Sequence, residues 1–154
     1  MIELLTANTP NGKKISIMLE EINFEYKVTK ININKDEQFK PDFIKLSPFR
    51  KIPIIIDHDV KKSLFESGAI LIYLGEKSGK FYDKDQRTTI NQWLMGQIGY
   101  VGPLLGQHHQ FHHYNPGKLK LILSGFHEVA LASVECFKRA RPNEKYKFEF
   151  TTSS

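Results

Sequence analysis

The residues with the clearest capacity for chemistry lie at 64–70, where an apolar segment runs into Glu66 and Ser67 before a strongly helical pattern begins. A hydroxyl side chain and the free amides of a first helical turn can bind a carboxylate, so Ser67 could hold an anionic group. Glu66 could hold an ammonium group beside it. The pair could therefore bind the zwitterionic end of a small peptide at a helix N-terminus.

A second candidate is Ile52-Pro53, which opens a short apolar stretch upstream. A free backbone edge can pair with an extended peptide, and the bond before a proline is where a cis peptide is least unfavourable. If both interpretations hold, the ligand is a peptide-like thiol and the protein is a redox or conjugating enzyme.

The third candidate is Thr9-Pro10-Asn11, at the junction of the first predicted strand and the first predicted helix. A helix N-terminus carries partial positive charge, which would stabilise a thiolate and lower the pKa of its thiol. The Thr9 hydroxyl and the Asn11 amide could each donate a hydrogen bond to the sulfur.

Each of these junctions also has a purely structural interpretation. Thr9 or Asn11 can cap the first helix while Pro10 fits its first turn, and Ser67 can cap a later helix with Glu66 solvated. Capping and ligand binding do not exclude one another, so the local pattern leaves both interpretations open.

The composition narrows the class of protein. The chain has 154 residues, 40% hydrophobic and 25% charged, which is enough for one ordinary domain, or one small domain and part of another. Acidic residues alternate with the basic ones that give a net charge of +5, which argues against nucleic-acid binding. No apolar run approaches the roughly 20 residues of a membrane helix, and the first residues read as a strand rather than a signal peptide. We expect a cytoplasmic protein with no membrane partner.

Cys136 is the only cysteine in the chain. The sequence therefore contains no internal disulfide, no Cys-x-x-Cys redox pair and no cysteine metal site. Any thiol chemistry would most simply use a thiol that the ligand brings.

The apolar spacing predicts the elements that position these residues. They are a strand at 2–7, a helix with Ile15, Met18, Leu19 and Ile22 at helical spacing, a strand at 24–30, a short irregular helix at 39–46, strands at 53–56 and 63–65, and a helix at 67–78. Strands joined by a crossover helix are parallel, and a closing hairpin adds an antiparallel edge. The order βαβαββα predicts an α/β, thioredoxin-like domain.

Beyond a linker at 79–83, a long helical segment is predicted from about Asp85 to His113, interrupted by Gly102-Pro103 and ended by residues 115–117. The remaining residues change character to an apolar strand-like run, a helical stretch and a final strand-like run. We predict a first domain at 1–79, a helical segment at 84–115 and a divergent tail at 116–154.

From Met1 to about Tyr114 the chain resembles the glutathione transferases, specifically the bacterial nu-class group related to the yeast nitrogen-regulatory prion protein. This covers roughly three quarters of the chain. The carrying segments are Thr9-Pro10-Asn11-Gly12-Lys13-Lys14-Ile15, Leu19-Glu20-Glu21, Gln38-Phe39, Leu46-Ser47-Pro48, Lys51-Ile52-Pro53, residues 64–74 and Gly102-Pro103-Leu104-Leu105-Gly106-Gln107.

The resemblance implies glutathione as the ligand, bound as a cosubstrate. It implies that Thr9 and Asn11 face the sulfur. Ile52, with Pro53 beside it, would pair with the cysteinyl backbone. Glu66 and Ser67 would hold the γ-glutamyl end. Gln38, helped by Lys51, would lie near the glycyl end.

Members of this group resemble glutathione-dependent disulfide reductases more than efficient conjugating enzymes. The resemblance thus implies a glutathione transferase or disulfide reductase that acts on a small electrophile or a disulfide, as a homodimer if the helical part suffices. Two alternatives remain: a non-catalytic glutathione- or partner-binding module, and a truncated chain with little activity.

His108, His109, His112 and His113 form two i,i+4 pairs that could clip a divalent metal on a helix face. No carboxylate accompanies them, and the family keeps a similar histidine-bearing stretch without a required metal. We expect no metal site.

The resemblance ends near Tyr114, where a complete family member continues with further helices. Residues 120–130 and 148–154 instead resemble the C-terminal end of flavin-dependent ferredoxin/thioredoxin reductase-like proteins. The dinucleotide-binding glycine motifs of those proteins are absent from the sequence, so we do not expect flavin binding. Our hypothesis is a fusion of two gene ends by deletion, which leaves a truncated, atypical C-terminal part.

Overall fold

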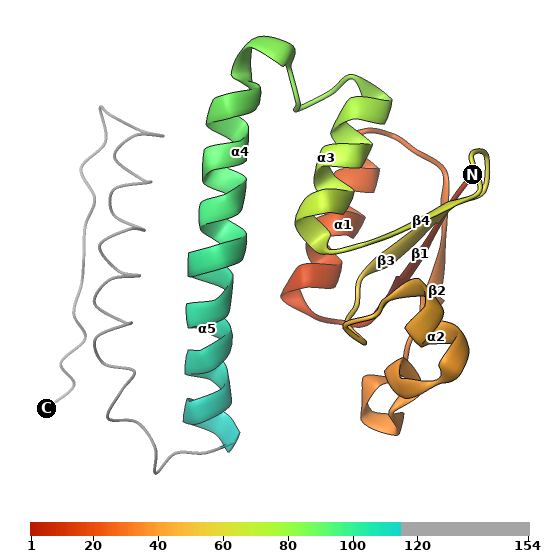
Figure 1. The fold of residues 1–154 in the computed structure, drawn as a ribbon, viewed down its shortest axis with the longest axis vertical. Coiled ribbons are helices and arrows are strands. Elements are labelled where there is room, and N and C mark those ends of the chain that lie inside the picture. Colours follow the sequence, from red (N-terminus) through yellow and green to blue (C-terminus); the bar gives the residue numbers. More distant parts are fainter. Residues whose placement is uncertain (115–154) are drawn as a thin grey trace, which may run out of the picture. The chain divides into compact units, whose positions relative to one another are not determined.

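The computed structural model describes residues 1–114 of the chain (Figure 1). The chain divides into two compact units, Met1–Leu94 and a second that begins at Met95, and each is considered by itself. The predicted tail at 116–154, its origin by fusion and the predicted break at 115–117 lie outside the described residues, so they stay predictions.

The first unit confirms the predicted order βαβαββα and the thioredoxin-like arrangement. Its elements are β1 (Ile2–Thr6), α1 (Pro10–Glu21), β2 (Tyr26–Lys30), α2 (Pro41–Leu46), β3 (Ile54–Asp57), β4 (Lys62–Phe65) and α3 (Ser67–Ser78). Two short 3-10 turns, Ile33–Lys35 and Glu37–Phe39, lie between β2 and α2. The third strand begins one residue later than predicted, because Pro53 has no amide hydrogen to give to a strand ladder.

The sheet has the strand order β2-β1-β3-β4, with β1 and β3 at its centre. β1 runs parallel to β2 and antiparallel to β3, and β4 closes the sheet as an antiparallel hairpin with β3. In the register, Leu5 lies opposite Ile54, and Ile54 lies opposite Phe65. The ends of three strands therefore meet along one line across the sheet.

Side chains alternate between the two faces of the sheet, as the period of two in a strand requires. On one face, α1 and α3 lie side by side and form the larger core, shared by Ile2, Leu4, Ile15, Leu19, Ile22, Ile55, Ile70 and Leu74 (Figure 1). The opposite face carries a smaller core of Leu5, Ile54 and Phe43, the last from α2. Neighbours such as Leu4 and Leu5 thus serve different cores, which fixes the register of the sheet.

The described residues that follow α3 are mainly helical, as predicted for the segment from about Asp85 to His113. α4 (Arg87–Gly96) and α5 (Gly102–His109) are joined by a π-helical turn at Gln97–Val101, and a second such turn covers Gln110–Tyr114. The sequence predicts an interruption at Gly102-Pro103, whereas the irregular turn comes just before it. The reason is that the ring of Pro103 crowds the preceding turn of helix, which widens. Among the described residues, no helix is long and apolar enough to span a membrane.

Asp57 ends β3 and is fully buried. Its Oδ2 accepts hydrogen bonds from Tyr73 Oη and Lys77 Nζ, each at 2.6 Å, and its Oδ1 accepts one from the Asp59 amide at 3.0 Å. Burial raises the pKa of Asp57, but these hydrogen bonds and the charge of Lys77 outweigh it and lower the pKa to about 2. The carboxylate therefore ties the end of β3 to the last turns of α3.

The low pKa of Asp57 predicts how stability depends on pH. The folded-state pKa of about 2 lies below the ordinary value of 3.8, so ionised Asp57 stabilises the fold by about 2 kcal/mol at neutral pH. That stabilisation is present above pH 4 and is lost as the pH falls towards 2. Asp57→Asn should therefore lower the free energy of unfolding at pH 7 by about 2–3 kcal/mol and flatten its dependence on pH between 5 and 2, measured by urea denaturation.

The matched control is Asp59→Asn, two residues along in the same turn. The Asp59 side chain is 62% exposed and pairs with the N-terminal ammonium, so its loss should cost less than about 1 kcal/mol. An Asp57→Asn protein that keeps the wild-type slope between pH 5 and 2 would contradict this account.

Candidate functional site

Three of the predicted site segments converge at one end of the sheet. Thr9 and Asn11 follow β1, Ile52-Pro53 precedes β3, and Glu66 and Ser67 follow β4. Since Leu5, Ile54 and Phe65 lie opposite one another, and neighbouring strands are about 4.8 Å apart, these segments are neighbours. The convergence follows from the strand pairing, since the segments are far apart in the sequence.

The segment after β1 ends in a capped helix. Thr9 is the N-cap of α1, and its Oγ1 accepts a hydrogen bond from the Gly12 amide at 3.2 Å. Of the two predicted caps the structure thus selects Thr9, while Asn11 is the exposed second residue of the helix. The bond to Gly12 uses a lone pair of the Thr9 oxygen, so the hydroxyl hydrogen can still be donated to another group.

Gly12 lets the segment between β1 and α1 fold tightly. A Cβ at this position would overlap Thr6 Oγ1 and lie 2.6 Å from the carbonyl oxygen of Ala7. The close approach brings the N-terminus of α1 against the end of β1. A side chain at position 12 would move Thr9 and Asn11.

The segment before β3 is fixed by Ser47, to which the sequence analysis assigns no role in the site. Ser47 is 1% exposed; its Oγ donates to the carbonyl of Lys51 at 3.0 Å and accepts from the Lys51 amide at 3.3 Å. The peptide bond between Ile52 and Pro53, the residues that follow Lys51 directly, is cis. Pro53 is buried and Ile52 half-buried, whereas the Lys51 side chain is exposed.

Gln38 lies in the 3-10 turn Glu37–Phe39. Its amide nitrogen donates to the carbonyl of Ile33 at 3.4 Å. Its Oε1 is buried and has no hydrogen-bond partner among the described residues. A buried acceptor of this kind is costly to leave unpaired, which makes it available to a donor on a ligand.

At the third segment, one prediction is wrong in detail. The sequence suggests Ser67 as the cap of the following helix, but α3 begins at Ser67 and its N-cap is Glu66. The Glu66 carbonyl accepts the first helical hydrogen bond, from Ile70 at 3.0 Å. Glu66 has φ +69° and ψ 115°, a positive-φ conformation outside the αL region that a non-glycine residue adopts only when its surroundings hold it there.

Ser67 has a partner that no local pattern in the sequence reveals. It is 8% exposed, and its Oγ accepts a hydrogen bond from Lys14 Nζ at 3.3 Å. Lys14 lies on α1, and only the packing of α1 beside α3 brings it there. Burial lowers the pKa of Lys14, and the carboxylate of Glu66 opposes that shift.

The described surface also contains a pocket of about 580 Å³ on the β2 side of α1. Its lining includes Asn8, Gly12, Ser16 and Val28. None of the eight predicted site residues is in that described lining, although Asn8 and Gly12 flank Thr9 and Asn11 in the chain. The pocket is therefore adjacent to the candidate site along the chain and not identical to it.

Of the four clustered histidines, the structure describes the side chains of His108, His109 and His112. The rings of His108 and His112 lie 5.4 Å apart between centroids. Within the part of the chain that the structure describes, no three histidine, cysteine, aspartate or glutamate side chains are grouped so that they could hold a metal ion.

What the site can do follows from its groups. Two helix N-termini, a hydroxyl beside each of them, a carboxylate and an ammonium group meet at one sheet edge. Helix N-termini and hydroxyls bind anionic groups, and the Glu66 carboxylate binds a cation. Such a set suits a ligand that carries both charges and extends across the strand ends.

Comparison with known proteins agrees with this geometry. The family model for the glutathione S-transferase N-terminal domain matches residues 2–76. The chain is 47% identical to the disulfide-bond oxidoreductase YfcG of Escherichia coli, over 75% of this chain and 57% of that protein. It is 37% identical to YghU, a second disulfide-bond oxidoreductase of that organism, over 81% of this chain and 47% of that protein.

Solved structures agree as well. A glutathione transferase from Pseudomonas putida with bound glutathione disulfide superposes with a TM-score of 0.82 at 39% identity, over 90% of this chain and 65% of that one. A glutathione transferase family member from Pseudomonas fluorescens with two bound glutathiones superposes with a TM-score of 0.81 at 35% identity, over 95% of this chain and 70% of that one. Ure2p in complex with glutathione superposes with a TM-score of 0.82 at 29% identity, over 92% of this chain and 69% of that one.

The chain belongs to the glutathione transferase family. Within it, the chain falls in the subgroup of the disulfide-bond oxidoreductases and the Ure2 proteins. It spans about half the length of these curated relatives, 57% of YfcG and 47% of YghU.

The close packing at Gly12 generates a prediction. Gly12→Ala should lower the free energy of unfolding by about 1–3 kcal/mol, because the added Cβ meets the backbone carbonyl of Ala7 and the loop must shift. Urea denaturation followed by circular dichroism measures the change.

Gly96→Ala in α4 is the matched control. No described neighbour lies within 4 Å of a Cβ there, so alanine should be neutral or add up to about 1 kcal/mol through its higher helix propensity. A Gly12→Ala protein as stable as wild type would contradict the claim that the Ala7 carbonyl leaves no space for a Cβ at position 12.

Proposed function

We propose that this protein binds glutathione and uses its thiol for glutathione-dependent disulfide reduction or transfer. The observation that carries the proposal is the convergence of Thr9, Ile52 and the Glu66-Ser67 pair at one sheet edge. Further support comes from relatives that are named disulfide-bond oxidoreductases and from similar structures with glutathione or its disulfide bound.

In this proposal, glutathione lies extended across the strand ends. Glu66 binds the γ-glutamyl ammonium, while the Ser67 hydroxyl and the first amides of α3 bind the γ-glutamyl carboxylate. The backbone of Ile52, held ahead of Pro53, pairs with the cysteinyl residue in the manner of an added strand. The Glu66 conformation, with φ +69°, supports a functional role at this position.

The glycyl end of glutathione would lie near Gln38 and Lys51. The buried and unpaired Gln38 Oε1 offers an acceptor for a ligand amide. The exposed ammonium of Lys51 offers a charge partner for the glycyl carboxylate. Lys51 is the weaker contact of the two, since an exposed ion pair contributes little.

The cysteinyl sulfur would lie at the N-terminus of α1. The partial positive charge of the helix end favours a thiolate over a thiol. The hydroxyl hydrogen of Thr9, which the bond to Gly12 leaves unused, donates to the sulfur, and the Asn11 amide donates a second hydrogen bond.

The reaction is a thiol–disulfide exchange that needs no protein cysteine. The glutathione thiolate attacks one sulfur of a disulfide, forms a mixed disulfide and releases the other sulfur as a thiolate. A second glutathione attacks the glutathione sulfur of the mixed disulfide, so glutathione disulfide leaves and the substrate is fully reduced. Two glutathiones lose the two electrons that the substrate gains. The pocket beside Asn8 and Gly12 is our proposed location for the second substrate, which in a conjugation would be a small electrophile.

The alternative is a glutathione-binding module without turnover. It is favoured by the 32% identity to a relative named transcriptional regulator URE2 of Saccharomyces cerevisiae. A purified chain that binds glutathione but does not reduce a model disulfide such as hydroxyethyl disulfide would support this alternative over the reductase.

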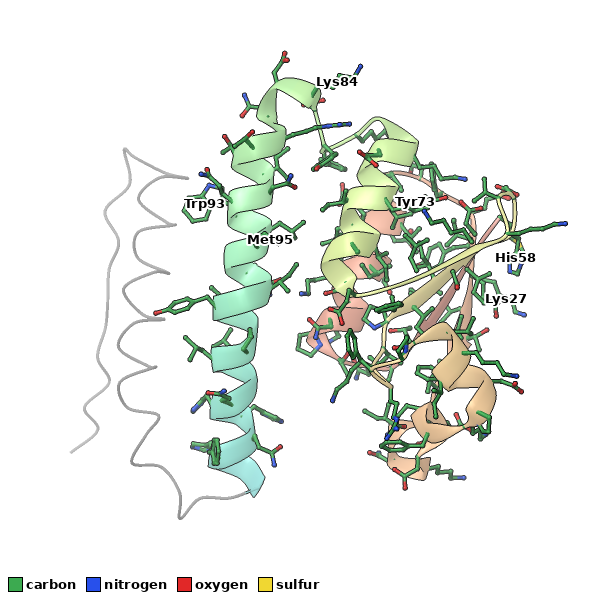
Figure 2. The ribbon with its side chains drawn as sticks, viewed as in Figure 1. Lys27, His58, Tyr73, Lys84, Trp93 and Met95 are labelled. Atoms are coloured by element: carbon green, nitrogen blue, oxygen red, sulfur yellow. The ribbon has the colours of Figure 1, made fainter. Side chains whose placement is uncertain are left out.

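We further infer a cytoplasmic homodimer. Support for self-association comes from α4, where Trp93 and Met95 are 46% and 51% exposed (Figure 2). Large apolar side chains that are exposed in one chain can be buried at an interface between two copies. Sedimentation equilibrium of the purified chain tests the dimer.

The binding proposal predicts the effect of two substitutions. Glu66→Gln removes the charge that faces the ligand ammonium, and Ser67→Ala removes the hydroxyl that faces its carboxylate. Each should weaken glutathione binding by roughly tenfold or more, since charge-assisted hydrogen bonds are lost. Isothermal titration calorimetry with glutathione, and retention on immobilised glutathione, measure the change.

Glu76→Gln is the matched control for charge, because Glu76 pairs with Arg87 near the opposite end of α3. It should leave the affinity for glutathione unchanged. Wild-type affinity in both Glu66→Gln and Ser67→Ala would refute the proposed site.

The sulfur chemistry predicts a difference between two substitutions at Thr9. Thr9→Val removes the hydroxyl and should lower kcat/KM for hydroxyethyl disulfide roughly 10- to 100-fold, because the thiolate loses a hydrogen bond. Thr9→Ser keeps the hydroxyl and should retain most of the activity.

Loss of the cap in Thr9→Val should also cost about 1 kcal/mol of stability, so both assays are run well below the unfolding temperature. Equal activity of the valine and serine proteins would exclude a role of the Thr9 hydroxyl at the sulfur.

A further inference from the structure

Lys14 is the one lysine of α1 whose described ammonium group reaches the N-terminus of α3. It is half-buried, unlike its exposed neighbour Lys13, and its Nζ lies 3.3 Å from Ser67 Oγ across 53 residues of chain. Its position is set by the packing of α1 beside α3 in the larger core. The contact therefore belongs to the architecture of the site and not to a local motif.

The contact fixes the direction of the Ser67 hydroxyl. An ammonium group has three donors and no acceptor, so Ser67 Oγ must accept the hydrogen bond from Lys14. The hydroxyl hydrogen of Ser67 then points away from Lys14 and is left to donate elsewhere. A buried hydroxyl held in this way is prepared to donate to an acceptor such as a carboxylate.

Lys14 also balances the charge of Glu66. A ligand carboxylate that binds at Ser67 comes close to the Glu66 carboxylate, and like charges at such distances repel. The electrostatic attraction between Lys14 and Glu66 favours the charged form of the lysine and opposes the lowering of its pKa by burial. With Lys14 present, the pair Lys14 and Glu66 is neutral overall and can accept a zwitterion.

We propose that Lys14 is a positioning residue that makes the site specific for the α-carboxylate of the γ-glutamyl group. It acts through Ser67, whose hydroxyl it orients, and through Glu66, whose charge it offsets. The inference rests on the proposed binding of glutathione and extends it to a residue that the sequence does not single out.

The test compares two ligands on the purified, full chain by isothermal titration calorimetry. One is glutathione. The other is 4-aminobutanoyl-cysteinyl-glycine, which keeps the terminal ammonium but lacks the α-carboxylate. Lys14→Met keeps the apolar stem and removes the charge. It should weaken glutathione binding roughly tenfold and change binding of the analogue less than about twofold, because only the carboxylate needs Lys14.

Lys27→Met is the matched control. It removes the same charge from β2, which is the outermost strand on the side of the sheet away from β4. The Lys27 side chain is 64% exposed there. Both affinities should stay at the wild-type value. Lys14→Arg keeps the charge and should retain the preference for glutathione over the analogue.

If Lys14→Met does not fold, as judged by circular dichroism and its melting temperature, Lys14→Gln takes its place. Its amide can still donate to Ser67 but carries no charge, and it should lose the same preference. An equal loss of affinity for both ligands would mean that Lys14 only supports the fold, and an unchanged preference would mean that it has no role; either result overturns the proposal. A folded wild-type chain that binds no glutathione overturns the proposed function together with this inference, whereas a binding wild type with an unchanged Lys14→Met overturns the inference alone.

Discussion

The pairing of β1 with β3 is the constraint on which the rest of the structure depends. Because Leu5 lies opposite Ile54 and Ile54 opposite Phe65, the chain leaves β1, enters β3 and leaves β4 at the same sheet edge. Each of these three points carries one predicted site segment. Alternate residues along the paired strands belong to the two cores, so a shift of the strand register by one residue would move the apolar side chains of each core to the wrong face of the sheet. The packing energy of the domain therefore also holds the site together.

The site itself is built mostly from backbone groups at helix ends. Two helices of twelve residues, α1 and α3, begin at the shared edge, and each brings unpaired amides and partial positive charge. Side chains refine this background: Thr9 satisfies one amide of α1, Gly12 permits the close turn, and Lys14 reaches Ser67. At its far end, α3 is anchored to β3 by the buried Asp57.

Much of the fold could be predicted from the sequence, because period-two and helical spacings of apolar residues are local signals. The order βαβαββα and the bounds of α3 agree with the structure. The predicted cap of α3 differs from the structure: Ser67 has a residue type preferred at caps, but Glu66 occupies the N-cap position. The irregular turn before Gly102 also differed, because the effect of Pro103 falls on the residues that precede it. The contacts of Ser47 and Lys14 could not be predicted, because Ser47 bonds to Lys51 within an irregular loop and Lys14 bonds to a residue of another helix.

The sequence by itself determined which residue types stand at the ends of strands and starts of helices, since capping and turn preferences depend on near neighbours. It also determined that any reactive thiol must come from outside the first 114 residues, because Cys136 is the only cysteine. Only the tertiary structure decided that three distant segments meet at one edge, and that an ammonium group from α1 enters the N-terminus of α3. Strand pairing and helix packing join residues dozens of positions apart, and no local pattern specifies such contacts.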